Sequence, residues 1–560
     1  MGTAQKSWDG TTAPEAQGYC GVTEECQHSS PPDLSNAVEE WRGRLGPLNV
    51  LFSESVRNDY AKSTLPVIRR PSGVLRPANT KEVQAAVRIA AKYRIPVYPI
   101  SRGKNWGYGS ASPVTDGQVI VDLSRMNRVL EVNDQLAYAV IEPGVSQGQL
   151  YEHLRDNGHS LMLDNTGAGP DASIVGNILE RGYGHSPYGD RFAHTCGFEV
   201  VLADGRVLNT GYGAYEGAKA ARVYPWGLGP WLDGLFTQSN FGIVTKVGMW
   251  LMPRPEVIQA FGFTVADDDI LDEIIDRLRM LRLTEVVRSH VHMANDLKVL
   301  SSRMTFPWHL TNETPLPDSI RQTLRESAAL GAWNVMGALY GTRETVAAAR
   351  RVVRKTFRGL VQVKFFDERK IKRLNKVANL LGHFGLGHNL RETLTSATSI
   401  YDLLKGIPSP DYLRGVAWRS KQPVAAPVDP NDYGCMWLSP VLPMTREACR
   451  ELRALVEPVL ARHKLEPLIT FTTVNERALD TMIQISFDKT DSRERANAEK
   501  CYEELFDLLF QQGYLPYRIG IQSMDKLDAA SSTFWDVCRK LKGTLDPNGI
   551  IAPGRYCPRS

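Results

Sequence analysis

The chain has 560 residues, of which 42% are hydrophobic and 23% charged, and its formal net charge is +4. This length predicts two or more domains, and the near balance of charge gives no indication of a nucleic-acid or membrane-surface partner. No run of about 18 apolar residues is present, which argues against a transmembrane helix. The N-terminus lacks the apolar segment of a secretory signal, and Lys6 breaks the myristoylation pattern.

The cysteine content indicates a reduced, intracellular protein. Eight cysteines are spread over the chain, without the C-x-x-C or Cys/His spacing of a zinc site. We therefore expect free thiols, a cytoplasmic location and no metal site. A disulfide between Cys20 and Cys26, the one close pair in the sequence, is the alternative.

The first half of the chain alternates strands and helices after a polar start. Residues 1–35 are rich in Ser, Thr, Gly, Pro and Gln and predict a mobile tail. From about residue 66 the pattern predicts a strand in 72–79, a helix over 81–94 capped by Thr80, and a buried strand over 95–100. The elements expected after these are strands in 117–124, 129–134, 137–144 and 242–253, a helix over 146–158 ending at Gly158, and a hairpin over 198–211 turning at Asp204-Gly205.

The second half has a different texture. From about 256 to 510, charged amphipathic helices such as 267–283 and 325–331 alternate with short strands such as 360–366 and 481–487. A Pro-rich loop covers 421–432, and the last 45 residues end in a polar, turn-rich segment. This pattern predicts a second, α+β domain.

One loop combines glycines with cations and aromatic residues. "PISRGKNWGYGSASP", residues 99–113, fits neither the Walker pattern nor the Rossmann G-x-G-x-x-G pattern. Its glycines permit positive φ and a close approach of backbone N–H groups to an anion, and Arg102 and Lys104 add positive charge. From the spacing alone, a ligand-binding loop and a tight surface loop without a ligand stay equally open.

The motifs around this loop decide between these alternatives. "EPGVS" (142–146), "SIVGNILERGYGHSPYGD" (173–190), "TQSNFGIVTKVGMWLMPRP" (237–255) and "DPNGIIAPGR" (546–555) follow it in order. Together they resemble the flavoprotein family of vanillyl-alcohol oxidase and the flavin subunit of 4-cresol methylhydroxylase. "NWGYGSASP" is most similar to the 4-cresol and eugenol hydroxylase branch. The resemblance is dense from about 75 to 255 and again from about 434 to 555.

The resemblance implies an α+β fold with a two-part FAD-binding domain and an inserted α+β cap. After the tail, the N-terminal part of the FAD domain would be 36–255, the cap or substrate domain 256–510, and 511–560 a segment that returns to the FAD domain and active site. The family also implies a homodimer by analogy.

The resemblance further assigns the cofactor site. The loop would run along the FAD pyrophosphate. For several glycines of the set that follows, the alternative role is that of an ordinary turn residue. The implied cofactor-binding residues are Ser101, Arg102, Gly103, Lys104, Asn105, Gly107, Pro143, Gly144, Asn177, Gly182, Gly242, Ile243, Val244 and Arg555.

The substrate site follows in the same way. Family members bind a phenol as its phenolate between two tyrosines and an arginine, and Tyr108, Tyr517 and Arg518 occupy the matching positions. Charge-assisted hydrogen bonds from these donors offset the cost of ionising a group with a pKa near 10. Hydride then leaves the benzylic carbon for flavin N5, giving a p-quinone methide that is hydrated or loses a proton to form an alkene.

Several positions depart from the family pattern. Cys435 stands where some relatives link FAD through His, and Val416 where others use Tyr, so we expect non-covalent FAD, with a cysteinyl link at Cys435 as the alternative. Gly167 or Ala168 replaces the Asp that oxidases place near N5.

Two further departures lie near the reacting carbon. His185 replaces a pocket Tyr and is either a general acid/base or a packed neutral side chain. Asp480-Thr481 replaces a His-His pair of the cap. These changes predict a phenol whose para chain differs from methyl, ethyl or allyl.

Three questions of activity stay open at this level. The acceptor is O₂ or a cytochrome c, and the sequence favours an oxidase over a dehydrogenase only weakly. Oxidative cyclisation of a phenolic natural product is an alternative reaction on the same scaffold. A flavin-binding protein without activity is disfavoured, because it would not need Tyr108, Tyr517 and Arg518.

Overall fold

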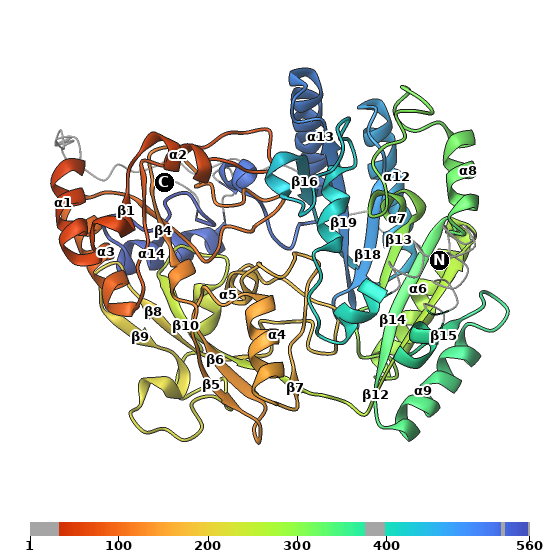
Figure 1. The fold of residues 1–560 in the computed structure, drawn as a ribbon, viewed down its shortest axis with the longest axis horizontal. Coiled ribbons are helices and arrows are strands. Elements are labelled where there is room, and N and C mark those ends of the chain that lie inside the picture. Colours follow the sequence, from red (N-terminus) through yellow and green to blue (C-terminus); the bar gives the residue numbers. More distant parts are fainter. Residues whose placement is uncertain (1–32, 374–375, 377–397, 528–531, 558–560) are drawn as a thin grey trace, which may run out of the picture.

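The computed structural model describes residues 33–373, 376, 398–527 and 532–557, and its ribbon divides into two halves (Figure 1). One half contains two small sheets built by the first 250 residues, and the other contains one large sheet built mainly from the middle of the chain. Most of the expected tail, together with Cys20 and Cys26, lies outside the described residues, whereas the six described cysteines are free thiols.

The first small sheet contains the predicted strand–helix–strand unit. Its order is β1 (Val50–Leu51), β2 (Gly73–Leu75), β4 (Val119–Asp122) and β3 (Val97–Ile100), with β4 parallel to both β2 and β3. Helix α3 (Thr80–Tyr93) connects β2 to β3 and buries the expected apolar stripe, and α1 (Leu34–Leu45) packs against it. Asn79, not Thr80, is the N-cap, because the Asn79 side chain accepts the Glu82 N–H while the Thr80 hydroxyl donates to Glu199.

The second small sheet is antiparallel, in the order β5-β6-β10-β8-β9. Its strands are β5 (Val129–Asn133), β6 (Tyr138–Ile141), β10 (Ile243–Trp250), β8 (Thr195–Val201) and β9 (Val207–Asn209), and Gly205 in the predicted hairpin turn has φ +78°. The helix predicted to end at Gly158 is α4 (Gln147–Asp156), which ends two residues earlier. Shorter elements of this half are α2 (Glu54–Tyr60), α5 (Ile174–Leu179), β7 (Leu161–Met162) and β11 (Met252–Pro253).

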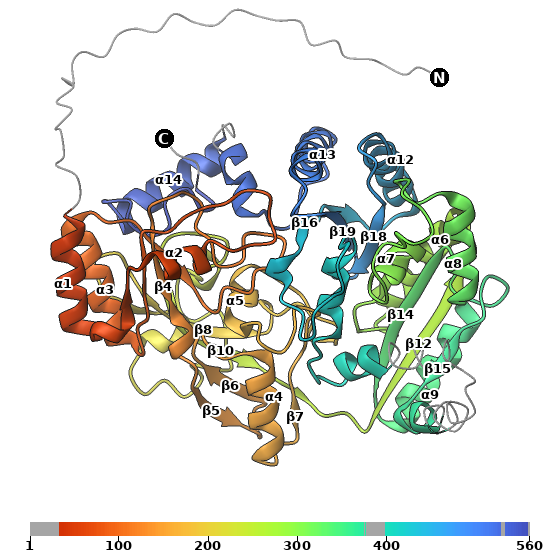
Figure 2. The same ribbon diagram turned by 45° about the horizontal axis from the view of Figure 1, so that its top comes forward.

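The C-terminal segment returns to this half, as Figure 2 shows for α14 (Thr533–Leu545). This helix is not among the elements predicted from the sequence, and its inner side chains pack on the core of the second sheet. Val97 N–H donates to Ile550 O over 2.8 Å, and Ala552 N–H donates to Val97 O over 2.7 Å. These backbone bonds attach the chain end to strand β3, immediately before the Gly-rich loop.

The large sheet has eight strands, in the order β15-β12-β14-β13-β18-β19-β16 with β17 also paired to β19. They are β12 (Val257–Val265), β13 (His292–Asn295), β14 (Trp333–Gly341), β15 (Lys364–Phe366), β16 (Gly434–Leu438), β17 (Val441–Pro443), β18 (Leu468–Thr473) and β19 (Ala478–Phe487). Every pair is antiparallel. The strand predicted over 360–366 forms only at its last three residues.

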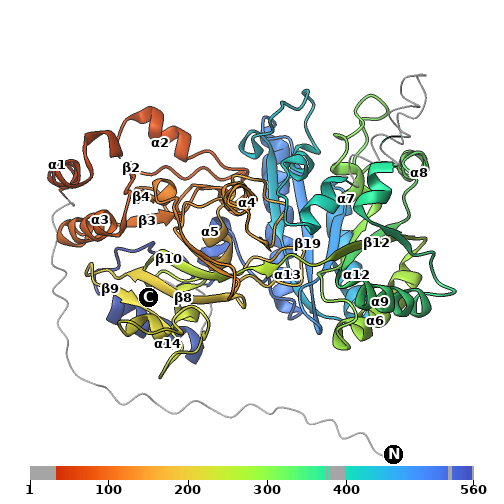
Figure 3. The same ribbon diagram turned by 60° about the horizontal axis from the view of Figure 1, so that its bottom comes forward.

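Amphipathic helices cover one face of this sheet. They are α6 (Asp268–Leu283), α9 (Arg343–Thr356), α12 (Arg446–Arg462) and α13 (Ser492–Gln511), which lie together in Figure 3, whereas α7 (Asp296–Ser301) and α8 (Asp318–Ser327) lie elsewhere. Because strand side chains alternate between faces, the even-numbered residues of β12, β13, β14, β18 and β19 fall on the opposite face.

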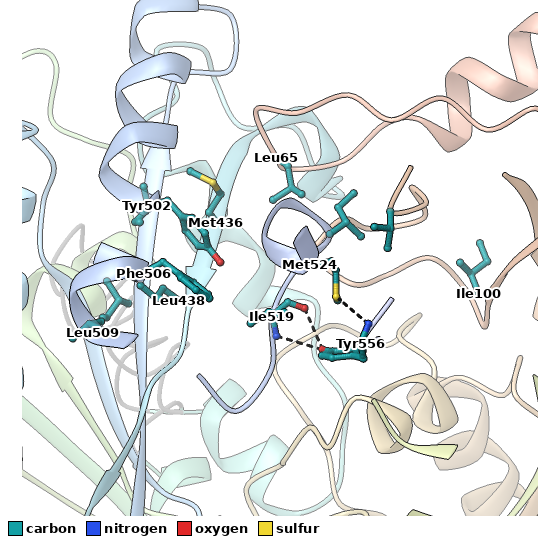
Figure 4. Close-up of a cluster of buried hydrophobic side chains, with 14 of the residues drawn as sticks. Leu65, Ile100, Met436, Leu438, Tyr502, Phe506, Leu509, Ile519, Met524 and Tyr556 are labelled. Carbon is teal, nitrogen blue, oxygen red and sulfur yellow. Dashed lines mark hydrogen bonds between the residues drawn. The ribbon is translucent and has the colours of Figure 1, made fainter. Parts of the chain in front are cut away.

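The two halves share a hydrophobic cluster, drawn in Figure 4. Met436 and Leu438 of β16 pack there with side chains of α13, and the C-terminal segment adds Ile519, Met524 and Tyr556. Tyr556 Oη accepts the Ile519 N–H over 3.3 Å and lies 3.2 Å from Ile519 O. This clamp fixes the segment that carries Tyr517 and Arg518.

Within the described ranges, no helix is long and apolar enough to cross a bilayer. The same residues contain no group of three His, Cys, Asp or Glu side chains that could hold a metal ion.

Candidate active site

A cavity of about 840 Å³ lies between the Gly-rich loop and the uncovered face of the large sheet. This volume falls within the range of small-molecule and cofactor sites. Its wall is contributed by residues 98–106, by α5 and the start of β10, by the large sheet, and by the C-terminal segment.

The Gly-rich loop makes a tight turn against the cavity. Asn105 O accepts the N–H groups of both Tyr108 and Ser110, over 3.1 and 3.0 Å. Gly107 has φ +73°, and a Cβ there would lie 1.6 Å from the Trp437 ring, so both the conformation and the space require glycine. Trp106, for which the sequence assigns no role, is 8% exposed and donates its indole N–H to Ala168 O over 3.2 Å.

Hydrogen bonds from Arg102 and a close approach of α5 also hold the loop against its neighbours. Arg102 donates to the backbone carbonyls of Asp171 and Gly144, over 2.8 and 3.2 Å. Its guanidinium therefore fixes loop geometry instead of pointing freely at an anion. At Gly176 a Cβ would come within 3.2 Å of Ser101 Oγ, so the first turn of α5 approaches the loop closely.

These features fit FAD. A glycine-lined strand-to-loop turn next to an open cavity leaves backbone N–H groups accessible to a pyrophosphate, and the cavity accommodates a cofactor-sized ligand. Of the fourteen predicted cofactor residues, the ones lining the cavity are Ser101, Arg102, Gly103, Lys104, Asn105, Asn177, Gly242, Ile243, Val244 and Arg555.

Gly107, Pro143, Gly144 and Gly182 do not line the cavity. Their surroundings give each one a structural reason for its position. A Cβ on Gly144 would lie 2.7 Å from three backbone carbonyls, and one on Gly182 would lie 2.2 Å from the Asn177 amide. Pro143 O accepts the Ser173 hydroxyl, the N-cap of α5, over 2.6 Å.

Arg555 lies at the cavity wall in a network of its own. Its guanidinium forms an ion pair with Glu180 and donates to Tyr98 Oη. Tyr556 Oη donates to the other Glu180 oxygen over 2.9 Å. This network ties the C-terminal segment to the residue that follows α5.

The three predicted phenol-binding residues lie together, and we name Tyr108, Tyr517 and Arg518 the Arg518 cluster. The Arg518 guanidinium carbon lies 3.9 Å from the centre of the Tyr108 ring and 5.4 Å from that of Tyr517. Tyr108 Oη lies 3.0 Å from Ser439 Oγ. Tyr517 and Arg518 line the cavity, whereas Tyr108 does not, and its ring packs against the guanidinium.

Arg518 has unused hydrogen-bond capacity. Its Nε is buried without a partner, and its Nη1 lies 3.5 Å from Asn105 Oδ1, the limit of a weak contact. No carboxylate among the described residues forms an ion pair with it. Burial by itself lowers the pKa of Arg518, but the adjacent Tyr517 and Tyr108 raise it above its usual value, so the guanidinium stays charged. Burial raises the pKa of Tyr517 well above its usual value, so this tyrosine is a neutral donor.

A second buried pair supports this cluster. Tyr183 Oη donates to Asp480 Oδ2, and the Tyr183 ring lies 5.7 Å from that of Tyr517. Burial raises the pKa of Asp480 to about 7, although Tyr183 and the charge of Arg518 both oppose the shift. Asp480 therefore holds a buried carboxyl group whose pKa lies well above that of an ordinary aspartate.

His185 lines the cavity and contacts a second histidine. His185 Nδ1 lies 2.6 Å from His292 Nε2, and His292 Nδ1 lies 3.0 Å from Thr472 Oγ1; we name these three residues the His185 cluster. Burial lowers the pKa of His185 to about 3 and that of His292 well below its usual value. Both rings are therefore neutral at pH 7, each with one N–H and one acceptor nitrogen.

The residues discussed for FAD linkage differ in access. Val416 lines the cavity, whereas Cys435 does not. Burial raises the pKa of the Cys435 thiol to about 12, which disfavours the thiolate that a covalent link would need.

Gly167 and Ala168 line the cavity, while Asp171 is exposed and lies 3.8 Å from Arg102.

Sequence reasoning did not find Tyr183, His292, Trp437 or Lys298, all of which line the cavity. Tyr183 lies within the quoted motif 173–190, two residues before His185, whereas the other three lie outside the quoted motifs. His292 comes near His185 only because β13 and the loop after α5 meet in space, 107 residues apart in the chain.

Comparisons with known proteins agree with this geometry. The FAD binding domain family matches residues 71–211. The chain is 40% identical to the 1'-carboxy-chondrochloren decarboxylase of Chondromyces crocatus, over 93% of this chain and 97% of that protein. It is 33% identical to the hydroxylating 4-cresol dehydrogenase flavoprotein subunit of Pseudomonas putida, over 93% and 95%.

A solved structure extends the match to the whole fold. The 4-ethylphenol oxidase of Gulosibacter chungangensis, in complex with isoeugenol, superposes with a TM-score of 0.85 at 30% identity, covering 95% of this chain and 99% of that one. The chain belongs to the family of FAD-binding oxidoreductases that contains vanillyl-alcohol oxidase and the 4-cresol methylhydroxylase flavoprotein.

Proposed function

We propose that this enzyme oxidises a para-substituted phenol at its benzylic carbon, with the substrate bound as phenolate by the Arg518 cluster. The observation that supports this most is the buried, charged Arg518 guanidinium, which has an unpartnered Nε and two tyrosines beside it. A buried guanidinium with no carboxylate in contact is costly at a cavity wall unless an anion joins it. A phenolate is the anion that the flanking tyrosine hydroxyls suit.

The chemistry follows from the charge on the oxygen. A free phenol ionises near pH 10, and charge-assisted bonds from Arg518, Tyr108 and Tyr517 lower that pKa by favouring the anion. The phenolate then donates electron density to the para carbon. FAD, when bound, would accept the hydride that the benzylic carbon attached to this ring carbon loses, and the substrate would become a p-quinone methide.

We propose that the His185 cluster controls what happens to the quinone methide. A histidine whose pKa is near 3 is a poor base, so His185 is better suited to orient a water molecule than to accept a proton permanently. The hydrogen bond to His292 fixes the ring. A water oriented at the benzylic carbon gives an alcohol, and loss of a side-chain proton gives an alkene.

One of the comparisons with known proteins supports a second fate for the quinone methide. Because a relative of 40% identity is named a decarboxylase, we propose decarboxylation as the alternative for a substrate with a carboxylate on the carbon next to the benzylic carbon. The bond to the carboxylate breaks, its electron pair forms the side-chain double bond, the ring regains its phenolate, and CO₂ leaves. Hydride loss in the preceding step supplies the oxidation, so no further oxidant is needed.

The sequence also supports proposals about the FAD linkage, the domain boundaries, the electron acceptor and the oligomeric state. We propose that FAD is bound without a covalent link, which the buried Cys435 thiol supports, and that the domains divide at 255 and 510. Either O₂ or a cytochrome c is the acceptor, and the protein is a homodimer. Fluorescence of the protein band on a denaturing gel would overturn the non-covalent proposal.

The test is anaerobic mixing of the FAD-loaded protein with 4-ethylphenol and vanillyl alcohol while the flavin absorbance is followed. Bleaching by these or by other para-alkylphenols is expected. If none of them bleaches the flavin, the proposed reaction is wrong. Trapping released CO₂ from a carboxylated substrate separates decarboxylation from hydration.

A further inference from the structure

A second cation without an acidic partner lines the same cavity. Lys298, the third residue of α7, donates its ammonium group to Gln484 Oε1, and Nζ lies 4.9 Å from the centre of the Trp437 ring. Among the described residues no carboxylate forms an ion pair with it. Asp296, on the same helix, is instead paired with Arg321 over 2.6 Å and with Arg325 over 3.8 Å.

The surroundings hold the ammonium in place. The Gln484 side-chain amide donates to Gly415 O and to Ser486 Oγ, both over 2.8 Å. With both N–H groups used, the Gln484 oxygen is presented to the lysine. An ammonium has three donors, so one serves Gln484 and two are left for a ligand. Burial lowers the pKa of Lys298 to about 8, which keeps it charged at neutral pH.

Strand β19 passes both sites: Lys298 and the Arg518 cluster each lie beside a different residue of this strand. Asp480, beside Tyr183 and Tyr517, and Gln484, beside Lys298, fall on the same face of this strand because they are separated by an even number of residues. Four residues of a strand span roughly 13 Å. Met482 lies between them and lines the cavity. A phenol ring with a para chain of several atoms bridges a distance of this order.

We propose that Lys298 binds a carboxylate on the para side chain of the phenol, which makes hydroxyphenyl-alkanoic acids or their conjugates the substrate class. This inference rests on the proposed function, because it takes the phenol oxygen to be held by Arg518. One anchor at each end fixes the ring, and the benzylic carbon then lies between them. The inference holds whether the carboxylate is retained or lost in the reaction.

The test compares acids with their uncharged amides on the FAD-loaded enzyme. The ligands are 3-(4-hydroxyphenyl)propionate and its homologues with one and two more methylene groups, each with the matching amide, and 4-ethylphenol as the reference. Dissociation constants are measured by anaerobic calorimetry on enzyme whose flavin has first been chemically reduced, because the oxidised flavin would oxidise the ligands. We expect the best acid to bind about 10-fold or more tightly than its amide, as a charge-assisted bond implies.

Variants then assign that preference to a residue. Lys298→Met should bring the acid-to-amide ratio close to one, while 4-ethylphenol binding and FAD content stay within about twofold of wild type. Lys298→Arg should keep part of the preference. Lys364→Met is the matched control, because Lys364 also lines the cavity but on β15, at the opposite edge of the sheet.

Three outcomes would overturn the inference. The wild-type enzyme binds every acid and its amide equally; or Lys298→Met weakens acid, amide and 4-ethylphenol alike; or Lys298→Met loses FAD, which would assign the lysine to the cofactor. If Lys298→Met does not fold, the wild-type ratio and Lys298→Arg still decide. If the phenols bind but none bleaches the flavin, the proposed function has failed, whereas the acid-to-amide ratio still reports separately on Lys298.

Discussion

The Arg518 cluster and the His185 cluster lie in one cavity but are built in different ways. The Arg518 cluster comes from two short segments, the Gly-rich loop and the C-terminal segment, which backbone hydrogen bonds hold together; Ile521 N–H, for instance, donates to Tyr108 O over 3.0 Å. The His185 cluster joins a loop to two strands of the large sheet. One cluster carries a charge and unused donors, whereas the other is neutral and internally hydrogen-bonded.

This difference separates two tasks. A charged, backbone-clamped group suits the part of a substrate that does not vary, which in our proposal is the phenol oxygen. Side chains on the open face of a sheet can change one at a time without disturbing the Arg518 cluster. The departures from the family pattern, at His185 and Asp480, lie around the Arg518 cluster. They leave Tyr108, Tyr517 and Arg518 in place.

The largest expected effect is that of Arg518→Met. Loss of the guanidinium removes the positive charge that favours the phenolate, and we expect anaerobic flavin reduction by 4-ethylphenol to fall by about 10³-fold. Arg518→Lys keeps the charge without the planar fork and should recover only part of the rate. A Met variant that reduces the flavin at the wild-type rate would contradict the role of this residue.

Tyr108→Phe should come next, with flavin reduction about 100-fold slower and FAD affinity within about twofold of wild type. The variant removes one hydroxyl and keeps the ring that packs on Arg518. Tyr514→Phe is the matched control, because the Tyr514 hydroxyl donates to Glu451 outside the cavity. Equal loss of FAD binding and of activity in Tyr108→Phe would show that the tyrosine serves the cofactor.

A smaller and different effect is expected from His185→Gln. The rate of flavin reduction should change by about threefold or less, while the ratio of alcohol to alkene product shifts by about 10-fold, because His185 acts after hydride loss. Product analysis by chromatography measures the ratio. His194→Gln, at a half-buried histidine that does not line the cavity and whose Nδ1 lies 2.7 Å from Asp190 O, is the control. A large loss of reduction rate with an unchanged ratio would place His185 in the first step.

The last expected effect concerns stability. Because the folded pKa of Asp480 is raised to about 7 from a usual value of 3.8, the protonated form stabilises the fold below pH 4, and this stability is lost as pH rises toward 7. Relative to Asp480→Asn, the wild type should lose up to about 1.4 kcal/mol per pH unit across that window. Melting temperatures of both proteins from pH 4.5 to 8 measure the difference, and parallel curves would contradict it.

The sequence and the structure agree best where a motif is local. The helix after β2, the hairpin at Gly205 and the loop with Tyr108 depend on short patterns, and a Tyr-Arg pair next to each other is visible in the sequence. Lys298, His292 and the Tyr183–Asp480 bond depend on strand register and on contacts across more than 100 residues. No local pattern reports such contacts, and a lone lysine or histidine is usually structural or exposed.

The central claim is that the Arg518 cluster binds the substrate as an anion. The most direct measurement is the ¹⁹F NMR shift of 4-fluorophenol, which has no benzylic hydrogen, bound to the FAD-loaded enzyme across a pH series. The account predicts that the pKa of the bound phenol lies at least about two units below its value in water, and that Arg518→Met removes this shift. A bound phenol that stays neutral up to its pKa in water would contradict the account.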